Sequence, residues 1–341
     1  MSKLFKNVLF SCGILLLFLI PLELILRSLG KEHEKKPYIH HSDLHHVNRA
    51  NYQFSDVSLE NEEIGDHKVT FDHSGRRVNE RIPIQKDVKE IWFLGDSFTA
   101  TYELSWKNTY VGQIESQTDY SVINFGVPTL SPLLYLLQLK KSVLSDSKKP
   151  DIIFIQLYNN DVEDDARYAN RANFNSLDIP IRCNGGSKFL KDVVSRLAIA
   201  NTLYVAVVNF KQGFQQNEPK VDTLENPVTD YELLPVIKED SRFIKSISQI
   251  SQFLDSLEIP YYFFSIPSRY SCITGDWETH TFDKEINHIL EDMSIPHISS
   301  LDSAFQEASL SNDLFYNIDW HCTIYGNKLI TQEILKLIMD I

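Results

Sequence analysis

Cysteine is scarce in this chain, with four residues in 341. That is too few for a scaffold held by disulfides, and no CxxC pair indicates a zinc ribbon or a thioredoxin-type redox motif. Basic residues are also in deficit, since 33 Lys and Arg face 46 Asp and Glu and give a formal net charge of −13. Because a nucleic-acid-binding protein usually presents a basic face, no nucleic-acid partner is expected. The hydrophobic share of 43% is enough for a sizeable core and excludes a disordered chain.

Residues 1–30 contain a long apolar segment. Residues 8–22 are apolar except for Ser11, and the stretch counted on to Leu29 has 22 residues. That length would cross a bilayer core of about 30 Å as a helix. We therefore expect an uncleaved, single-pass transmembrane helix at the cell membrane. The alternative is a cleaved signal peptide, because a shorter apolar run also fits its hydrophobic region.

The bulk of the chain is expected to be extracytoplasmic, either periplasmic or extracellular. Basic residues are no fewer after the apolar segment than before it, but long domains cross membranes largely regardless of nearby charge. Residues 31–88 are interpreted as a juxtamembrane linker and N-terminal extension, with a strand and turn at 68–79. The four histidines of this segment could bind a metal, but no carboxylate or cysteine has matching spacing, which favours a solvated linker. They are His40, His41, His45 and His46.

From residue 89 onwards, strands and helices alternate in the predicted pattern. The apolar runs expected as buried strands are 90–94, 120–125, 151–158, 260–266 and, more weakly, 295–299. Apolar residues at helical spacing follow at 243–257 and 330–338. This alternation predicts a parallel sheet with helices on both faces, over residues 89–341. An insertion at about 162–235 interrupts it and holds one apolar helix candidate, 189–209.

Polar residues follow the predicted strands at places suited to catalysis. The first three groups read GDSFT (95–99), NFGVP (124–128) and NND (159–161), and DWH (319–321) stands before the last helix. Ligands bind at the carboxyl ends of parallel strands, where such groups would converge. A lone Gly-Asp-Ser would more simply be a helix cap. Four groups in strand context favour one cleft instead.

These four groups, in this order, resemble the SGNH (GDSL-type) hydrolase family, and the N-terminal segment resembles its membrane-anchored branch. The resemblance implies a three-layer α/β/α fold with a flavodoxin-like parallel sheet and one N-terminal transmembrane helix. It also implies that Ser97 is the nucleophile, that His321 is its base, and that Asp319 orients the imidazole. The implied oxyanion hole consists of the N–H groups of Ser97 and Gly126 and the side-chain amide of Asn160.

The chain departs from the family pattern at two places. Tyr158 stands where the third group usually has glycine, which would narrow the cleft or reshape the acyl pocket. Asp319 precedes the histidine by two positions and not by three, a spacing found in some anchored, polysaccharide-modifying relatives. If Asp319 is not the third member, Ser97 and His321 could act as a dyad. Asp161 and Asp313 are the fallback carboxylates.

The resemblance implies a serine esterase that removes acyl, for example acetyl, groups from a small ester or a cell-envelope or secreted glycan. An O-acyltransferase with the same triad is the alternative, and a non-catalytic, membrane-anchored assembly factor is a third possibility. The expected partners are the acylated substrate and the membrane, and no metal or organic cofactor is required. In an exported domain Cys183 and Cys272 could form a disulfide, although sequence does not give their separation. Cys322, beside the histidine, is interpreted as a packing residue.

Overall fold

The computed structural model describes residues 3–28, 37–55, 68–79, 88–145, 149–185, 237–278, 282–310, 313–316 and 320–339. The chain divides into two units, Met1–Lys36 with Ser187–Pro227, and Pro37–Gly186 with Val228–Ile341. Of the first unit the structure describes only the helix α1 (Lys3–Ser28). The sheet, its covering helices and the candidate site belong to the second unit. The predicted helix at 189–209 lies outside the described residues.

Helix α1 carries charge close to its carboxyl end, where Arg27 Nε lies 2.8 Å from Glu23 Oε1. In the part of the chain that the structure describes, no helix has the length and apolar composition needed to cross a membrane. The predicted transmembrane helix is therefore not supported.

The centre of the second unit is a parallel sheet. Four predicted apolar runs form adjacent parallel strands in the order β11-β8-β6-β7. Their bounds are Glu90–Leu94 for β6, Ser121–Asn124 for β7, Ile152–Leu157 for β8 and Tyr261–Ser265 for β11. Every residue of β6 and β8 is buried, as expected for strands covered on both faces. The weak fifth run does not form a strand and contributes one bridge, between His297 and Phe263.

The sheet is mixed, which differs from the fully parallel sheet predicted. Beyond β7, three short antiparallel strands extend it in the order β5-β4-β3. They are Arg77–Val78, Val69–Phe71 and Gln53–Phe54. All three come from residues 31–88, which were interpreted as a linker and extension. Strand β4 confirms the strand predicted at 68–79, whereas β3 and β5, of two residues each, are too short to produce an apolar run.

The histidine-rich segment is a structured hairpin and not a solvated linker. Strand β1 (Tyr38–His41) pairs with β2 (His45–Asn48) in antiparallel register. The His46 side chain is 4% exposed, and its Nε2 lies 2.8 Å from the carbonyl oxygen of Pro128. Burial lowers the pKa of His46, which favours a neutral imidazole there. No group of three or more His, Cys, Asp or Glu suited to hold a metal occurs among the residues that the structure describes.

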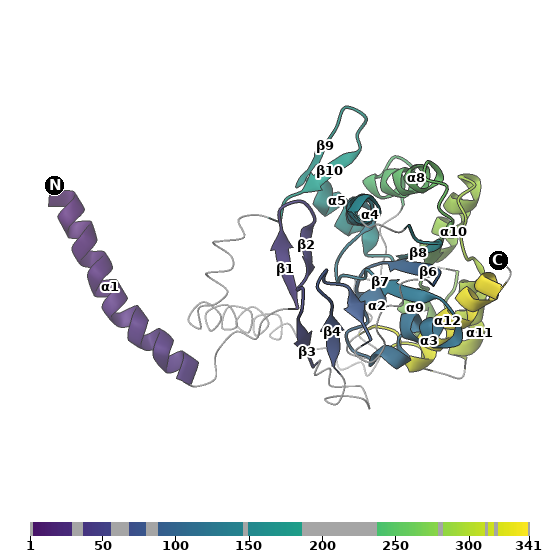
Figure 1. Ribbon diagram of the computed structural model, residues 1–341, viewed down its shortest axis with the longest axis horizontal. Coiled ribbons are helices and arrows are strands. Elements are labelled where there is room, and N and C mark those ends of the chain that lie inside the picture. Colours follow the sequence, from purple (N-terminus) through teal and green to yellow (C-terminus); the bar gives the residue numbers. More distant parts are fainter. Residues whose placement is uncertain are drawn as a thin grey trace. The chain divides into compact units, whose positions relative to one another are not determined.

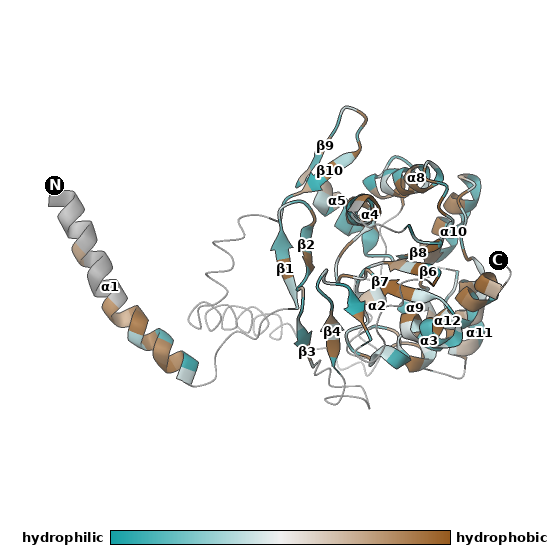
Figure 2. Ribbon diagram, in the orientation of Figure 1, coloured by the Kyte–Doolittle hydropathy of each residue, from teal (hydrophilic) through white to brown (hydrophobic). Residues whose placement is uncertain are grey.

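Helices cover both faces of the sheet, as predicted (Figure 1). One face is covered by α4 (Pro132–Ser145), α8 (Arg242–Asp255) and α10 (Phe282–Asp292). The opposite face is covered by α3 (Tyr110–Gln117), α11 (Ser300–Ser309) and α12 (Ile324–Met339). Alternate residues of β6 enter the two cores, with Trp92 in the first and Phe93 in the second. Figure 2 colours the strands of the parallel sheet largely brown, whereas teal segments mark polar residues of α8 and α11.

The two cores separate the cysteines for which a disulfide was considered. Cys183, at the end of β10 (Pro180–Cys183), is buried in the core under α4 and α8. Cys272, in α9 (Arg269–Thr274), packs against the core on the other face. Both are free thiols, so the Cys183–Cys272 disulfide is wrong. The sheet lies between the two cores and keeps these side chains apart.

Candidate active site

Ser97 lies at the carboxyl end of the central strand β6, at the first position of the short helix α2 (Ser97–Ala100). Its neighbour Asp96 is the N-cap, and Asp96 Oδ1 accepts a hydrogen bond of 2.9 Å from the backbone N–H of Phe98. Asp96 is fully buried, whereas Ser97 is partly exposed. The strand and its cap thus hold the predicted nucleophile at the carboxyl edge of the sheet, where ligands bind in open α/β folds.

The other end of α2 is held by a buried cation. Arg77 is 1% exposed, and its guanidinium donates hydrogen bonds to the carbonyl oxygens of Ala100, Thr101 and Leu104. These carbonyl oxygens lie at the C-terminal end of α2 and in the turn that follows, where a positive charge is favourable. Arg77 therefore fixes both the helix that begins with the serine and the loop after it.

Asn160 reaches the same edge from the end of the neighbouring strand β8. Its Nδ2 lies 3.3 Å from Asp96 Oδ2 and 3.2 Å from Asp164 Oδ2. The next residue, Asp161, accepts a hydrogen bond of 2.9 Å from the N–H of Tyr158 and so braces the loop. The amide predicted for the oxyanion hole is therefore beside the nucleophile's helix, and its two N–H groups face carboxylates of this chain.

Burial controls the charge of these carboxyls. It raises the pKa of Asp96, and the Phe98 N–H and the charge of His321 oppose that rise. Burial also raises the pKa of Asp164 to about 6, against the opposing effect of Arg167. Asn160 thus lies between two carboxyls whose ionised forms are disfavoured by burial, and an uncharged amide suits such a position.

Gly126 follows β7 on the other side of α2. A Cβ added there would lie 2.6 Å from the carbonyl carbon of Thr99, so only glycine allows this close approach. The Gly126 N–H donates to Asn124 Oδ1 at 2.7 Å, and Asn124 Nδ2 donates to the Thr99 carbonyl oxygen at 2.8 Å. Gly126 therefore packs at the site as expected, while its role as an oxyanion donor stays a prediction.

His321 precedes α12 and lies against α2. Its ring is edge-on to Phe98, with 4.9 Å between the ring centroids, and its side chain is 22% exposed. Glu103 Oε1 lies 4.0 Å from His321 Nδ1. Trp320, directly before the histidine, has a φ of 65°, a left-handed conformation unusual for a bulky residue. Asp319 lies outside the described residues, so its role as third member of the triad stays a prediction.

A buried polar network connects the histidine segment to the serine helix. In α12, Asn327 Oδ1 accepts the N–H of Tyr110 at 3.0 Å, and Asn327 Nδ2 donates to the carbonyl oxygen of Cys322 at 3.1 Å. The Tyr110 hydroxyl donates in turn to Thr99 Oγ1 at 2.8 Å. Cys322 itself is 3% exposed, and burial raises its thiol pKa well above the usual value. It is a packing residue, as expected.

Aromatic rings line the serine's other side. Tyr158, the residue that replaces the usual glycine, has its ring centroid 4.3 Å from that of Phe98. Phe98 directly follows Ser97, and Tyr158 precedes Asn160 by two positions, so the two rings belong to the same edge. This contact is consistent with a narrow acyl pocket.

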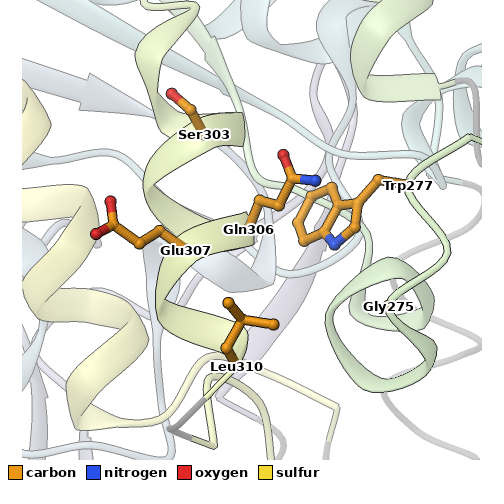
Figure 3. Close-up of a pocket in the computed structure, with 6 residues that line it drawn as sticks. All are labelled: Gly275, Trp277, Ser303, Gln306, Glu307 and Leu310. Atoms are coloured by element: carbon orange, nitrogen blue, oxygen red, sulfur yellow. The ribbon is translucent and has the colours of Figure 1, made fainter.

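A hollow lies away from these residues, between the turn after α9 and helix α11 (Figure 3). It has a volume of about 410 Å³, and the Trp277 ring lies toward Gln306 of α11. Its other lining residues are Gly275, Ser303, Glu307 and Leu310. None of the predicted site residues lines this hollow, so it is separate from the serine edge.

Sequence reasoning predicted Ser97, Gly126, Asn160 and His321 as site residues, and the structure places them around α2. It missed Glu103 and Arg77 as parts of this site. Glu103 lies in an aperiodic loop, and its approach to the histidine depends on a contact between segments more than two hundred positions apart. Arg77 lies in the segment 68–79, which was predicted only as a strand and turn.

Residues 91–198 match the family model described as GDSL-like Lipase/Acylhydrolase. A solved structure of a member of the lipolytic protein G-D-S-L family from Veillonella parvula DSM 2008 is 12% identical, with a TM-score of 0.42, over 74% of this chain and 100% of that chain. A catalytic mutant of Axe2, an acetylxylan esterase from Geobacillus stearothermophilus, is 10% identical, with a TM-score of 0.42, over 74% and 95% of the two chains. No curated protein matches the chain. The family match over 91–198, which includes Ser97, Gly126 and Asn160, supports the GDSL/SGNH lipase–acylhydrolase family and an ester-hydrolysing enzyme.

Proposed function

We propose that the chain hydrolyses an acyl ester through an acyl-serine intermediate on Ser97. The observation that carries the proposal is that both flanking residues of Ser97 contact other predicted site residues. Asp96 is bonded to Asn160, and Phe98 packs against His321. A serine hydroxyl is a weak nucleophile until a base is within reach, and His321 is the base that this edge supplies.

The reaction proceeds in two proton-balanced steps. His321 Nε2 takes the proton of Ser97 Oγ as the oxygen attacks the ester carbonyl carbon. The same proton then passes to the leaving alcohol as the carbon–oxygen ester bond breaks, and the acyl group remains on the serine. Water next gives a proton to His321 and attacks the acyl-serine, and that proton returns to Ser97 as the free acid leaves.

The negative oxygen of each tetrahedral intermediate would be held by the N–H groups of Ser97 and Gly126 and the amide of Asn160. Each such donor is worth about 3–4 kcal/mol in the transition state. The Asn160 bonds to Asp96 and Asp164, at 3.3 and 3.2 Å, are long for hydrogen bonds, so the amide can turn toward a stronger acceptor. The Gly126 N–H would be shared with Asn124.

We further propose a short acyl group, such as acetyl, on a glycan. The proposal of a short acyl group is supported by Tyr158, which stands where the family usually has glycine and packs against Phe98, the residue after Ser97. The glycan part rests on the two-position interval between Asp319 and His321, which resembles that of polysaccharide-modifying relatives.

The test uses the full chain with a fluorophosphonate probe and a series of nitrophenyl esters of increasing acyl length, together with an O-acetylated oligosaccharide. Wild-type protein should be labelled, Ser97→Ala should not, and acetyl should be cleaved faster than octanoyl. An unlabelled, folded wild type with no ester cleavage would contradict the acyl-serine proposal. Acyl groups that appear only on an added oligosaccharide acceptor would indicate transfer in place of hydrolysis.

A further inference from the structure

Glu103 is a buried acid beside the candidate base. It lies in the loop between α2 and the 3₁₀ helix η1 (Trp106–Asn108), and it is 3% exposed. Its Oε1 is 4.0 Å from His321 Nδ1, which is within ion-pair distance but longer than a hydrogen bond. Nδ1 is the ring nitrogen that does not face the serine in the proposed mechanism. A small rotation of either side chain would bring the two atoms into hydrogen-bond distance, as often happens when substrate binds.

The loop holds this carboxylate in place. Thr101 has a φ of 45°, which turns the chain sharply after α2, and the Leu104 N–H donates to the Thr101 carbonyl oxygen at 3.3 Å. Arg77 bonds to the carbonyl oxygens of both residues, and Leu104 is fully buried. Glu103 stands between them, so its backbone is fixed on both sides. A preorganised carboxylate of this kind can orient a partner without reorganising during the reaction.

Because the Glu103 carboxylate is buried, its short distance to His321 affects the stability of its charge. An ionised carboxylate withdrawn from water is costly unless a positive charge or hydrogen-bond donor compensates it. An imidazolium formed on His321 would be such a charge. Among the residues that the structure describes, Asp96 interacts with the charge of His321, Tyr102 and Cys322 interact with that of Glu103, and Arg77 lies near Tyr102.

We propose that Glu103 is a positioning residue of this site. Its carboxylate accepts the Nδ1–H of His321, which keeps Nε2 free to take the proton of Ser97, and it stabilises the imidazolium that results. The proton taken from Ser97 stays on Nε2, and Glu103 remains ionised throughout. This role rests on the proposed function, and it gives to a carboxylate of the serine loop the part that the family resemblance implies for Asp319.

The test compares Glu103→Gln with Glu90→Gln in the full chain. Glu90 is the matched control because it is also a buried glutamate, at 8% exposure, but stands at the opposite end of β6. Glutamine keeps the size of the side chain and removes its charge. Turnover of nitrophenyl acetate is measured from acid to alkaline pH, and folding is checked by circular dichroism.

We expect Glu103→Gln to lower kcat by roughly 100-fold or more with little change in KM. The acidic limb of the kcat profile should move to lower pH by about 1 unit, because loss of the anion lowers the pKa of the imidazolium. Glu103→Asp, which withdraws the charge by one methylene, should give a limb between those of wild type and Glu103→Gln. Glu90→Gln should leave kcat and the limb unchanged.

The proposal is overturned if the acidic limb of the kcat profile lies at the same pH in Glu103→Gln as in wild type. That result, even with a lower kcat, indicates a purely structural role. If Glu103→Gln does not fold, the pH of the acidic limb of Glu103→Asp is compared with that of wild type in the same way. Asp319→Asn, measured in parallel, should lower kcat less than Glu103→Gln does, and the reverse order overturns the role of Glu103. A wild type that neither reacts with the fluorophosphonate nor cleaves esters defeats the proposed function itself, and this inference with it.

Discussion

Asn160 Nδ2 and Asp96 Oδ2 lie 3.3 Å apart, so the end of β8 is bonded to the cap of the serine helix. The other oxygen of Asp96 accepts the N–H of Phe98. One buried carboxyl therefore orients two groups at once, the helix that begins with Ser97 and the amide predicted to hold the oxyanion. The geometry explains why an aspartate precedes the serine, since its two oxygens point at two different donors.

Asp96→Asn tests this double role. The asparagine oxygen can still cap the Phe98 N–H, but its amide would face the amide of Asn160, and two donors repel each other. We expect kcat for an acetyl ester to fall by about 10²–10³-fold, close to the loss of one oxyanion donor, with KM nearly unchanged.

Steady-state kinetics and the rate of fluorophosphonate labelling provide the measurements for this variant. Asp292→Asn, an exposed position on α10, is the control and should behave as wild type. A normal kcat in Asp96→Asn would show that Asn160 does not need this bond.

Gly126→Ala is expected to disturb the site because the added methyl group would collide with the backbone of α2. The new methyl group would lie 2.6 Å from the carbonyl carbon of Thr99, which is backbone and can yield only if α2 moves. We expect a loss of about 1–3 kcal/mol in the free energy of unfolding and a large fall in kcat. Urea unfolding and ester kinetics measure the two effects.

The matched variant for this prediction is Gly275→Ala. Gly275 has a φ of +71° and no atom within 4 Å of an added Cβ. Alanine there costs about 1–2 kcal/mol of backbone strain but leaves α2 in place, so kcat should stay normal. Equal kinetic effects of the two substitutions would contradict a special role of the close approach at Gly126.

Much of this arrangement could be predicted from local sequence, because the relevant signals are local. The run at 90–94 is apolar at every position except its first and became β6 with the same bounds, and the periodic residues at 330–338 lie in α12. The shared location of the predicted site residues that follow strands could be inferred because parallel strands end at one edge.

What was missed depends on contacts between distant segments. Strands β3 and β5 have two residues each, and pairing with neighbouring strands, not their own pattern, makes them strands, whereas β4 lies in the strand predicted at 68–79. Glu103 and His321 are far apart in the chain and meet only after α12 docks on α3. The disulfide was wrong because sequence does not show on which face of the sheet each thiol packs.

Asp165 is predicted to stabilise the fold by capping a helix from another segment. This fully buried carboxyl accepts hydrogen bonds from the hydroxyl of Ser131 and, at 2.8 Å, from the N–H of Leu133, at the start of α4. Asp165→Ala leaves two buried donors without that acceptor, so the free energy of unfolding should fall by about 1–3 kcal/mol. Asp165→Asn retains one acceptor oxygen and should lose less. Urea unfolding that ranks the two variants in the opposite order would contradict the capping role.

Stability should also depend on pH through Asp283 at the start of α10. This buried carboxyl accepts the N–H of Ser268 at 2.8 Å and the hydroxyl of Ser265 at 3.2 Å. Burial, followed by the nearby charge of Asp302, raises the pKa of Asp283 to about 7. Burial likewise raises the pKa of Asp302 to about 6.

The sign of the effect follows from which state holds the protons. An aspartate in the unfolded chain ionises near pH 4, whereas these two carboxyls stay protonated in the folded protein up to about pH 6 and 7. Between those limits the folded state binds more protons, so the free energy of unfolding falls as pH rises, by about 1 kcal/mol per pH unit for one such group. Asp283→Asn mimics the protonated form and should flatten this slope, whereas the exposed Asp292→Asn should not. Urea unfolding between pH 4 and 8 measures the slope, and equal slopes in wild type and Asp283→Asn would show that Asp283 ionises alike in both states.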